Sequence, residues 1–229
     1  MNQLSGKFEK KKKMKEVIVV GASGLVGNEL VKQLIENKNI VKIHLLVRKE
    51  VHFKDPKISV HLVDFTDESQ LKNAIQGEII YCCIGTTKAK TPDLSNYEKI
   101  DRDIPIKLAQ LGYSKGISQF HLISAIGANA QSKINYNRIK GEAEEGVKSS
   151  NIPYIFIYHP AMLIGKRSES RPLEWIAQKI SPILDLFMIG SLRKFHSVKV
   201  SNLAKTMVKN SLSKASNKIN FITYPQFEK

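Results

Sequence analysis

The segment Gly21-Ala22-Ser23-Gly24-Leu25-Val26-Gly27 carries three glycines at intervals of three residues. It joins an apolar run at 16–20, typical of a strand buried on both faces, to an amphipathic run at 25–37 with helical spacing. Gly21 permits a sharp turn, Gly24 lets a pyrophosphate reach bare backbone, and Gly27 lets the helix pack closely on the strand. The N–H groups and positive dipole end of the helix favour phosphate. We therefore predict a dinucleotide-binding loop formed by Gly21, Ser23, Gly24, Leu25, Val26 and Gly27, against the alternative of a tight turn without a ligand.

Strand-like and helix-like runs alternate along the 229 residues, which predicts an α/β fold. We expect a Rossmann-type doubly wound parallel sheet in a single domain over residues 15–229, with a small C-terminal region that covers the substrate. Residues 1–14 are expected to form a basic flexible tail. The expected strands are 16–20, 41–47, 58–63, 79–84, 120–124, 154–158 and 219–223. The expected helices are 25–37, 67–75, 95–111, 134–149 and 172–180, with Pro105 either kinking the third of them or lying near a helix start.

The chain is strongly basic, with 36 Lys and Arg against 21 Asp and Glu and a formal net charge of +15. About a third of the excess lies in the first 15 residues, and the remainder is scattered as single lysines with little aromatic interleaving. A polyanion-binding function would rest on the tail alone. We therefore expect a basic solvated surface and regard nucleic acid as an unlikely partner.

Several classes of protein are disfavoured by what the sequence lacks. No apolar run approaches the roughly 20 residues of a membrane-spanning helix, and no signal peptide is visible. Cys82 and Cys83 are adjacent, so they neither bridge each other comfortably nor supply a zinc site, and the six histidines lack metal spacing. We expect no metal, a cytoplasmic location, a small-molecule substrate and a monomer or homodimer.

The end of the second expected strand indicates which cofactor binds. Enzymes that use NAD usually carry an acidic residue there to hold the ribose hydroxyls, but this chain has Arg48 and Lys49. Both cations can contact a 2′-phosphate, which predicts NADP(H) in preference to NAD(H). The alternative is that they simply open a basic surface loop. Asp64 and Phe65, after the third expected strand, are placed to meet the edge and face of the adenine.

Ser124, Tyr136 and Lys140 are the candidate catalytic residues. Ser124 closes the fifth expected strand, and the spacing of four places Tyr136 and Lys140 on one face of the next helix. A phenol is a weak acid, and a nearby ammonium favours its ionised form and lowers its pKa. Ser124 would hold the substrate oxygen while Tyr136 exchanges the proton. The alternative is a surface helix that happens to contain both residue types.

These motifs resemble the atypical or extended short-chain dehydrogenase/reductases, and most closely their Tat-interactive oxidoreductase-like branch. The resemblance covers roughly residues 17–208 and rests on Cys82-Cys-Ile-Gly-Thr-Thr-Lys88, Asp101-Arg-Asp103, Leu122-Ile-Ser-Ala-Ile-Gly-Ala128, Lys140-Gly-Glu142, His159-Pro-Ala161 and Glu169-Ser-Arg-Pro-Leu-Glu-Trp175. It implies a bound NADPH, with Cys83, Gly85, Thr86, Tyr136 and Lys140 at the cofactor and His159 and Pro160 on its nicotinamide side. One position differs from the commoner members: Asp101 stands where their catalytic tetrad has a helix asparagine.

Two functions from different classes follow. The first is an NADPH-dependent oxidoreductase that transfers a hydride to a small carbonyl-like substrate at Ser124, Tyr136 and Lys140. The second is an NADP(H)-binding regulatory or interaction protein with little turnover. The three retained side chains favour the enzyme, whereas the substitution at Asp101 favours the regulator.

Overall fold

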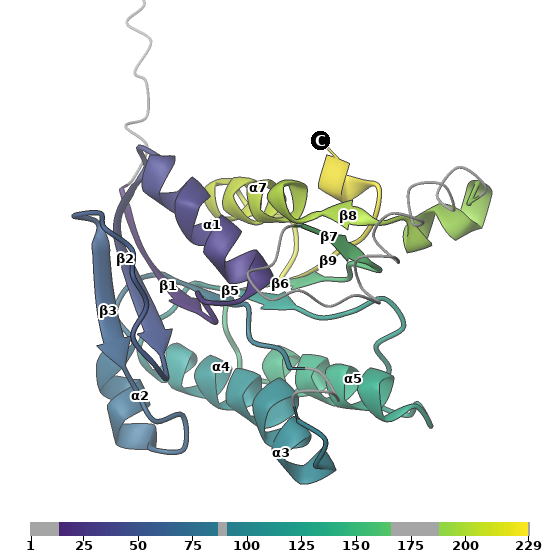
Figure 1. Cartoon of the computed structure of the whole chain (residues 1–229), viewed down its shortest axis with the longest axis horizontal. Coiled ribbons are helices and arrows are strands. Elements are labelled where there is room, and N and C mark those ends of the chain that lie inside the picture. The colour runs from purple at the N-terminus through teal and green to yellow at the C-terminus, as the bar shows by residue number, and fades with distance from the viewer. Residues whose placement is uncertain (1–13, 87–90, 166–187, 229) are drawn as a thin grey trace, which may run out of the picture.

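The core of the protein is a sheet of seven parallel strands (Figure 1). The computed structural model describes residues 14–86, 91–165 and 188–228. The strand order is β3-β2-β1-β4-β5-β6-β9. The strands are β1 Lys15–Val20, β2 Ile40–Val47, β3 Ile58–Leu62, β4 Ile79–Cys82, β5 Gln119–Ile123, β6 Tyr154–Tyr158 and β9 Ile219–Ile222; β7 Leu163–Ile164 and β8 Val198–Lys199 form a separate parallel pair. The Rossmann-type fold predicted from the sequence is confirmed.

The central strands are continuous apolar runs because helices cover both faces of the sheet. Val17, Ile18, Val19 and Val20 of β1 are all fully buried, and their side chains alternate between two hydrophobic clusters. One cluster contains α1 and α7 and the other contains α2, α4 and α5, as the two helical layers of Figure 1 show. The helices are α1 Leu25–Glu36, α2 Glu68–Ala74, α3 Leu94–Glu98, α4 Ile104–Ser114, α5 Asn135–Lys148 and α7 Val200–Leu212.

The helix expected at 95–111 is broken by one wide turn. After α3, residues Lys99–Asp103 form a π-helical turn in which the Ile104 N–H bonds to the Lys99 carbonyl, and α4 then continues with Pro105 in its first turn. Proline has no N–H, and its ring collides with the carbonyl four residues earlier in an α-helix. The wide turn avoids that collision with the Asp101 carbonyl, and the Asp101 side chain is buried in the protein interior.

One further difference lies in the C-terminal third, and another lies at the end of β4. Helix α7 was absent from the expectations, although Leu203, Ala204 and Met207 lie on its buried face, because polar residues separate these positions along the chain. The helix expected at 172–180 and the motif at 169–175 lie outside the described residues. The strand expected to reach Ile84 ends at Cys82.

The strand order creates the crevice in which the site lies. From β1 the chain crosses to β2 and β3 on one side, and then returns to β4 on the other side of β1. The loops that follow β1 and β4 therefore diverge at the carboxyl edge of the sheet. Such a switch point is where ligands bind in open α/β sheets.

Candidate functional site

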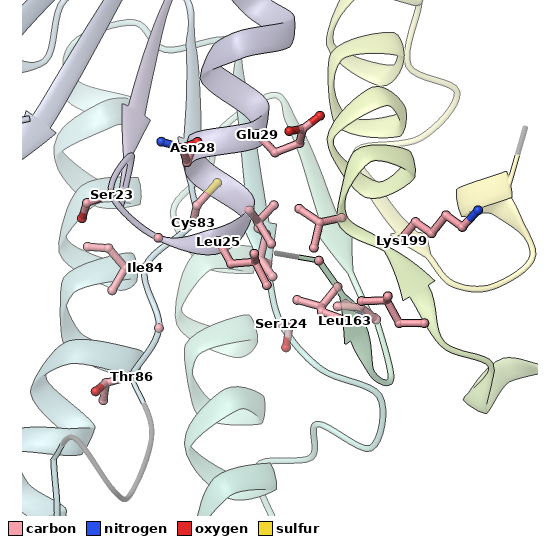
Figure 2. Close-up of a pocket in the computed structure, with 18 of the residues that line it drawn as sticks. Ser23, Leu25, Asn28, Glu29, Cys83, Ile84, Thr86, Ser124, Leu163 and Lys199 are labelled. Carbon is pink, nitrogen blue, oxygen red and sulfur yellow. The ribbon is translucent and has the colours of Figure 1, made fainter. Parts of the chain in front are cut away.

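A cavity of about 990 Å³ opens at this switch point. Figure 2 shows its lining side chains, which come from α1, the loop after β4, the end of β5 and the β7–β8 pair. Eleven predicted residues line it: Ser23, Gly24, Leu25, Val26, Cys83, Gly85, Thr86, Ser124, Tyr136, Lys140 and Pro160. The fold thus gathers segments more than 130 residues apart in the sequence (Ser23 to Pro160) around one space.

The glycine loop forms the wall of the cavity at the start of α1. Gly21 has a φ of +87°, and a Cβ there would lie 2.7 Å from the Cys83 carbonyl oxygen. A Cβ at Gly27 would collide with the Gly21 carbonyl. Gly24 caps α1 without a side-chain hydrogen bond, and the first turn carries no acid. The first N–H groups of α1 thus lack a side-chain cap, which suits a phosphate.

Six predicted cofactor residues do not line the cavity. Gly21 and Gly27 act through backbone geometry, as described above. Arg48 and Lys49 are exposed after β2, the strand next to β1. Asp64 is exposed and accepts bonds from the Thr66 N–H and hydroxyl, which hold its pKa below the ordinary value, whereas Phe65 is buried in the core.

The Lys140 ammonium is paired with an internal carboxylate. Lys140 Nζ lies 2.8 Å from Asp101 Oδ1, with side-chain exposures of 9% and 0%. The other oxygen, Oδ2, accepts the Thr86 N–H at 2.8 Å. Burial opposes the charge on Lys140, but Asp101 and Tyr136 raise the pKa of Lys140 above its ordinary value overall. Asp101 thus joins the π turn, the loop after β4 and helix α5.

The surroundings of Tyr136 correct the expectation that a nearby lysine lowers its pKa. The pKa of Tyr136 lies above its ordinary value. Burial of the phenol is the largest cause and raises the pKa, the Lys140 ammonium lowers it, and the Asp101 carboxylate raises it. The lowering by Lys140, whose charge is paired with Asp101, is therefore outweighed.

Ser124 belongs to a buried cluster that the sequence did not reveal. Its hydroxyl donates a short hydrogen bond to Glu144 Oε1, and His159 Nε2 lies 2.8 Å from the same oxygen. Ser124 and Glu144 are both buried. Glu144 follows Lys140 by four residues and so lies on the same face of α5, but no sequence motif distinguished it from the adjacent Glu145.

Four charged side chains hold α5 against the segment that carries Asp101. Arg138 binds Glu98 at 2.9 Å and Glu142 at 2.8 Å, and Arg102 binds Glu142 at 3.0 Å and Glu98 at 3.4 Å. Each of these side chains is 22–27% exposed. These partly exposed ion pairs join α5 to the segment that carries Asp101, and the buried Lys140–Asp101 pair joins the same two segments in the interior.

The two cysteines are poor nucleophiles in this environment. Burial raises the pKa of Cys82 to about 12 and raises the pKa of Cys83 well above its ordinary value. Both thiols therefore stay protonated near neutral pH. Cys83 contributes its backbone and an uncharged side chain to the cavity wall.

Neither a membrane span nor a metal site is found in the part of the chain that the structure describes. Among those residues no helix combines the length and apolar character needed to cross a bilayer. The same residues contain no group of three or more His, Cys, Asp or Glu side chains arranged to hold an ion.

Residues 21–176 match the model of a protein family described as NAD(P)H-binding. The chain is 30% identical over 212 residues to protein HTATIP2 of Rattus norvegicus, covering 91% of this chain and 86% of the relative. It is also 30% identical over 191 residues to protein fmp52, mitochondrial, of Emericella nidulans, covering 80% and 78%. The resemblance to the Tat-interactive branch is confirmed.

Solved structures with the same fold hold nucleotides. The Bordetella bronchiseptica enzyme WbmH in complex with NAD⁺ superposes with a TM-score of 0.69 at 15% identity, covering 92% of this chain and 76% of that one. UDP-N-acetylglucosamine 4-epimerase from Methanobrevibacter ruminantium M1 gives a TM-score of 0.69 at 16% identity, covering 92% and 77%. At such identity the likeness shows the fold alone.

The expected cytoplasmic location is wrong. The Emericella relative and the FMP52 proteins of Saccharomyces cerevisiae and Candida albicans, which are each 31% identical to this chain, are all named mitochondrial. The expectation rested on two adjacent cysteines that do not bridge each other, and the lack of a disulfide does not specify the cytoplasm.

Proposed function

The chain belongs to the NAD(P)H-binding family, and from that premise we propose that it is an NADPH-dependent oxidoreductase acting on a small carbonyl-like substrate. The observation that carries the proposal is the meeting of the glycine loop with Ser124, Tyr136 and Lys140 around one cavity. A protein that only bound the nucleotide would have no need of a hydroxyl, a phenol and an ammonium at this place.

The residues present fit a dinucleotide. The uncapped start of α1 and the bare backbone at Gly24 suit its pyrophosphate. Arg48 and Lys49, exposed at the end of the strand beside β1, would bind a 2′-phosphate, which supports NADP(H) over NAD(H). When bound, NADPH would supply a hydride to the carbonyl carbon of the substrate.

The side chains of the protein would manage the proton and the oxygen. Ser124 would donate a hydrogen bond to the substrate oxygen, and Tyr136 would give its phenolic proton to that oxygen as negative charge develops there. The Lys140 ammonium would then stabilise the phenolate that remains. Each of these roles requires only groups that already line the cavity.

A second candidate is a nucleotide-binding regulator with little turnover. Two observations favour it: Lys140 is paired with Asp101, and the Ser124 hydroxyl is already donated to Glu144. Both catalytic groups would have to leave or share an internal partner before they act on a substrate.

The deciding experiment starts with purified full-length protein. Native mass spectrometry would identify a bound nucleotide, and loss of NADPH absorbance would then be followed against a panel of aldehydes and ketones. Consumption that depends on both protein and carbonyl supports the oxidoreductase. Tight NADPH binding without consumption across the panel would support the regulator instead.

A further inference from the structure

We propose that Ser124, Glu144 and His159 form a proton path between the cavity and the edge of the molecule where α5 meets β9. The path rests on the proposed reduction, in which one proton per turnover has to be replaced from outside. In it Glu144 and His159 act through Ser124 and are positioning residues, because neither lines the cavity.

The three side chains make one continuous chain of hydrogen bonds. Ser124 lines the cavity and donates to Glu144 Oε1, and His159 Nε2 contacts that same oxygen at 2.8 Å. The Glu144 side chain is only 8% exposed, whereas that of His159 is 16% exposed. Exposure therefore increases from the carboxylate outwards, as a route to water requires.

The outer end of the path is covered by an aromatic ring. The His159 ring packs against Phe221 of β9 at a centroid distance of 5.5 Å, and Phe221 itself is 47% exposed. The His159 backbone N–H bonds to the Ile222 carbonyl, so the main chain of His159 is held beside β9. His159 thus lies between a buried carboxylate and a surface side chain.

The neighbouring charges are already paired with other groups. On α5, Lys140 is bound to Asp101 and Lys148 is bound to Glu145 at 2.6 Å, while Lys148 also lies 5.9 Å from the centre of the Phe221 ring. On β9 the contact with His159 is the uncharged Phe221 ring. Among the described side chains, the direct partners of the Glu144 carboxylate are therefore Ser124 and His159.

The order of contacts decides what chemistry is available. In a hydrolytic triad the imidazole lies between the serine and the acid, so that it removes the serine proton. Here the acid lies between Ser124 and His159, so the imidazole does not touch the hydroxyl. The arrangement suits transfer of a proton along hydrogen bonds and gives no activated serine nucleophile.

The proposed transfer balances without any change of electrons. His159 passes a proton to Glu144, Glu144 passes one to Ser124, and Ser124 passes one through the bound substrate oxygen to the Tyr136 phenolate. Each group gives one proton and receives one, and His159 recovers its proton from water. In the described structure a proton has no comparable route to Tyr136 from the Lys140 side, because Lys140 is paired with Asp101, whose side chain is 0% exposed.

Nuclear magnetic resonance of the His159 ring in full-length, ¹⁵N-labelled protein tests the path directly. We expect Glu144→Gln to move the ¹⁵N resonance of His159 Nε2, because the carboxylate oxygen 2.8 Å away is replaced by an amide. We expect Ser124→Ala to move the same resonance, because Glu144 Oε1 loses a donor and interacts more strongly with His159. Glu145→Gln, which removes the same charge from the adjacent and more exposed position, should leave it in place.

A second experiment uses the unaltered protein in its two nucleotide complexes and needs no variant. NADP⁺ carries a positive charge on its nicotinamide ring that NADPH lacks, so with a connected path the His159 Nε2 resonance should differ between the two nucleotide complexes. An identical resonance in both complexes, or no response to Ser124→Ala in the free protein, overturns the path. If neither nucleotide binds, the proposed function fails, and the Ser124→Ala result in the free protein still decides whether the cavity and His159 are linked.

Discussion

Lys140 Nζ and Asp101 Oδ1 lie 2.8 Å apart in the interior, which joins helix α5 to the π turn between α3 and α4. A buried ion pair offsets the cost of removing two charges from water only if both partners remain. The pair therefore links the stability of the fold to the charge on Lys140, a candidate catalytic residue.

The first prediction concerns Asp101→Asn. The Asp101 carboxylate raises the pKa of Tyr136, so its neutralisation should lower that pKa and allow the phenolate to form at lower pH. Difference absorbance of the phenolate, with Tyr136→Phe subtracted, would measure the change. Asp103→Asn is the matched control, because it removes a charge from the same turn at a 47% exposed side chain bound to Arg102. An unchanged titration in Asp101→Asn would show that its carboxylate does not act on the phenol.

The second prediction concerns the energy of the same pair. Lys140→Met leaves the Asp101 carboxylate buried without its cation, which should cost about 3–5 kcal/mol of unfolding free energy. The double variant Asp101→Asn/Lys140→Met should lose less than the sum of the two single variants, because no buried charge is left unpaired. Urea unfolding of the four proteins measures the coupling. Strict additivity would mean that the two side chains do not interact energetically.

The third prediction concerns cofactor choice. Arg48→Asp should weaken NADPH binding by about 1.5–3 kcal/mol and leave NADH binding nearly unchanged, because only NADPH carries the 2′-phosphate. Cofactor fluorescence titration gives both affinities. Lys54→Asp makes the same change of charge at another exposed residue beyond β2 and controls for the general field of a basic protein. Equal affinities for the two nucleotides in the unaltered protein would contradict the assignment of Arg48.

The fourth prediction separates chemistry from binding at Tyr136. Tyr136→Phe removes one hydroxyl and keeps the ring, so NADPH affinity should persist while turnover falls by about 10²–10⁴-fold. Tyr113→Phe, at an exposed tyrosine of α4, should preserve both. The test compares Kd from fluorescence with kcat on any carbonyl that the panel identifies. Retention of the original rate in Tyr136→Phe would mean that another group donates the proton.

The fifth prediction concerns acid stability and residue His121. This residue is fully buried, its Nδ1 lies 2.9 Å from the Tyr158 hydroxyl, and burial lowers its pKa to about 3. In the unfolded chain the ring protonates near its ordinary value of 6.5, so the unfolded state binds more protons between pH 6.5 and 3. The contribution of His121 to stability is complete above that interval and should fall by on the order of a few kcal/mol as the pH drops through it.

Urea unfolding at pH 7, 5 and 4 would measure this dependence. His121→Gln should be less stable at pH 7 but should lose less stability towards pH 4 than the unaltered protein. His52→Gln, at an exposed histidine, should reproduce the unaltered slope. Parallel slopes for His121→Gln and the unaltered protein would assign the acid sensitivity to other groups.

The Rossmann-type sheet and the local part of the site could be predicted from the sequence. The glycine loop between strand and helix predicted the sharp turn at Gly21 and the close packing at Gly27, because both depend on a few adjacent residues. The alternation of apolar runs predicted the parallel sheet, because strands covered on both faces have to be apolar throughout. Spacing of four along α5 predicted that Tyr136 and Lys140 reach the same cavity.

The pairing of side chains from distant segments could not be predicted from the sequence. Asp101 is 39 residues from Lys140, and Glu144 meets His159 from another element, so neither pairing has a signature in local spacing. Burial of the phenol, together with the Asp101 carboxylate, reverses the expected shift of the Tyr136 pKa, and Glu144 occupies the Ser124 hydroxyl. Charges act through space and burial, and both quantities are fixed only when distant segments pack together.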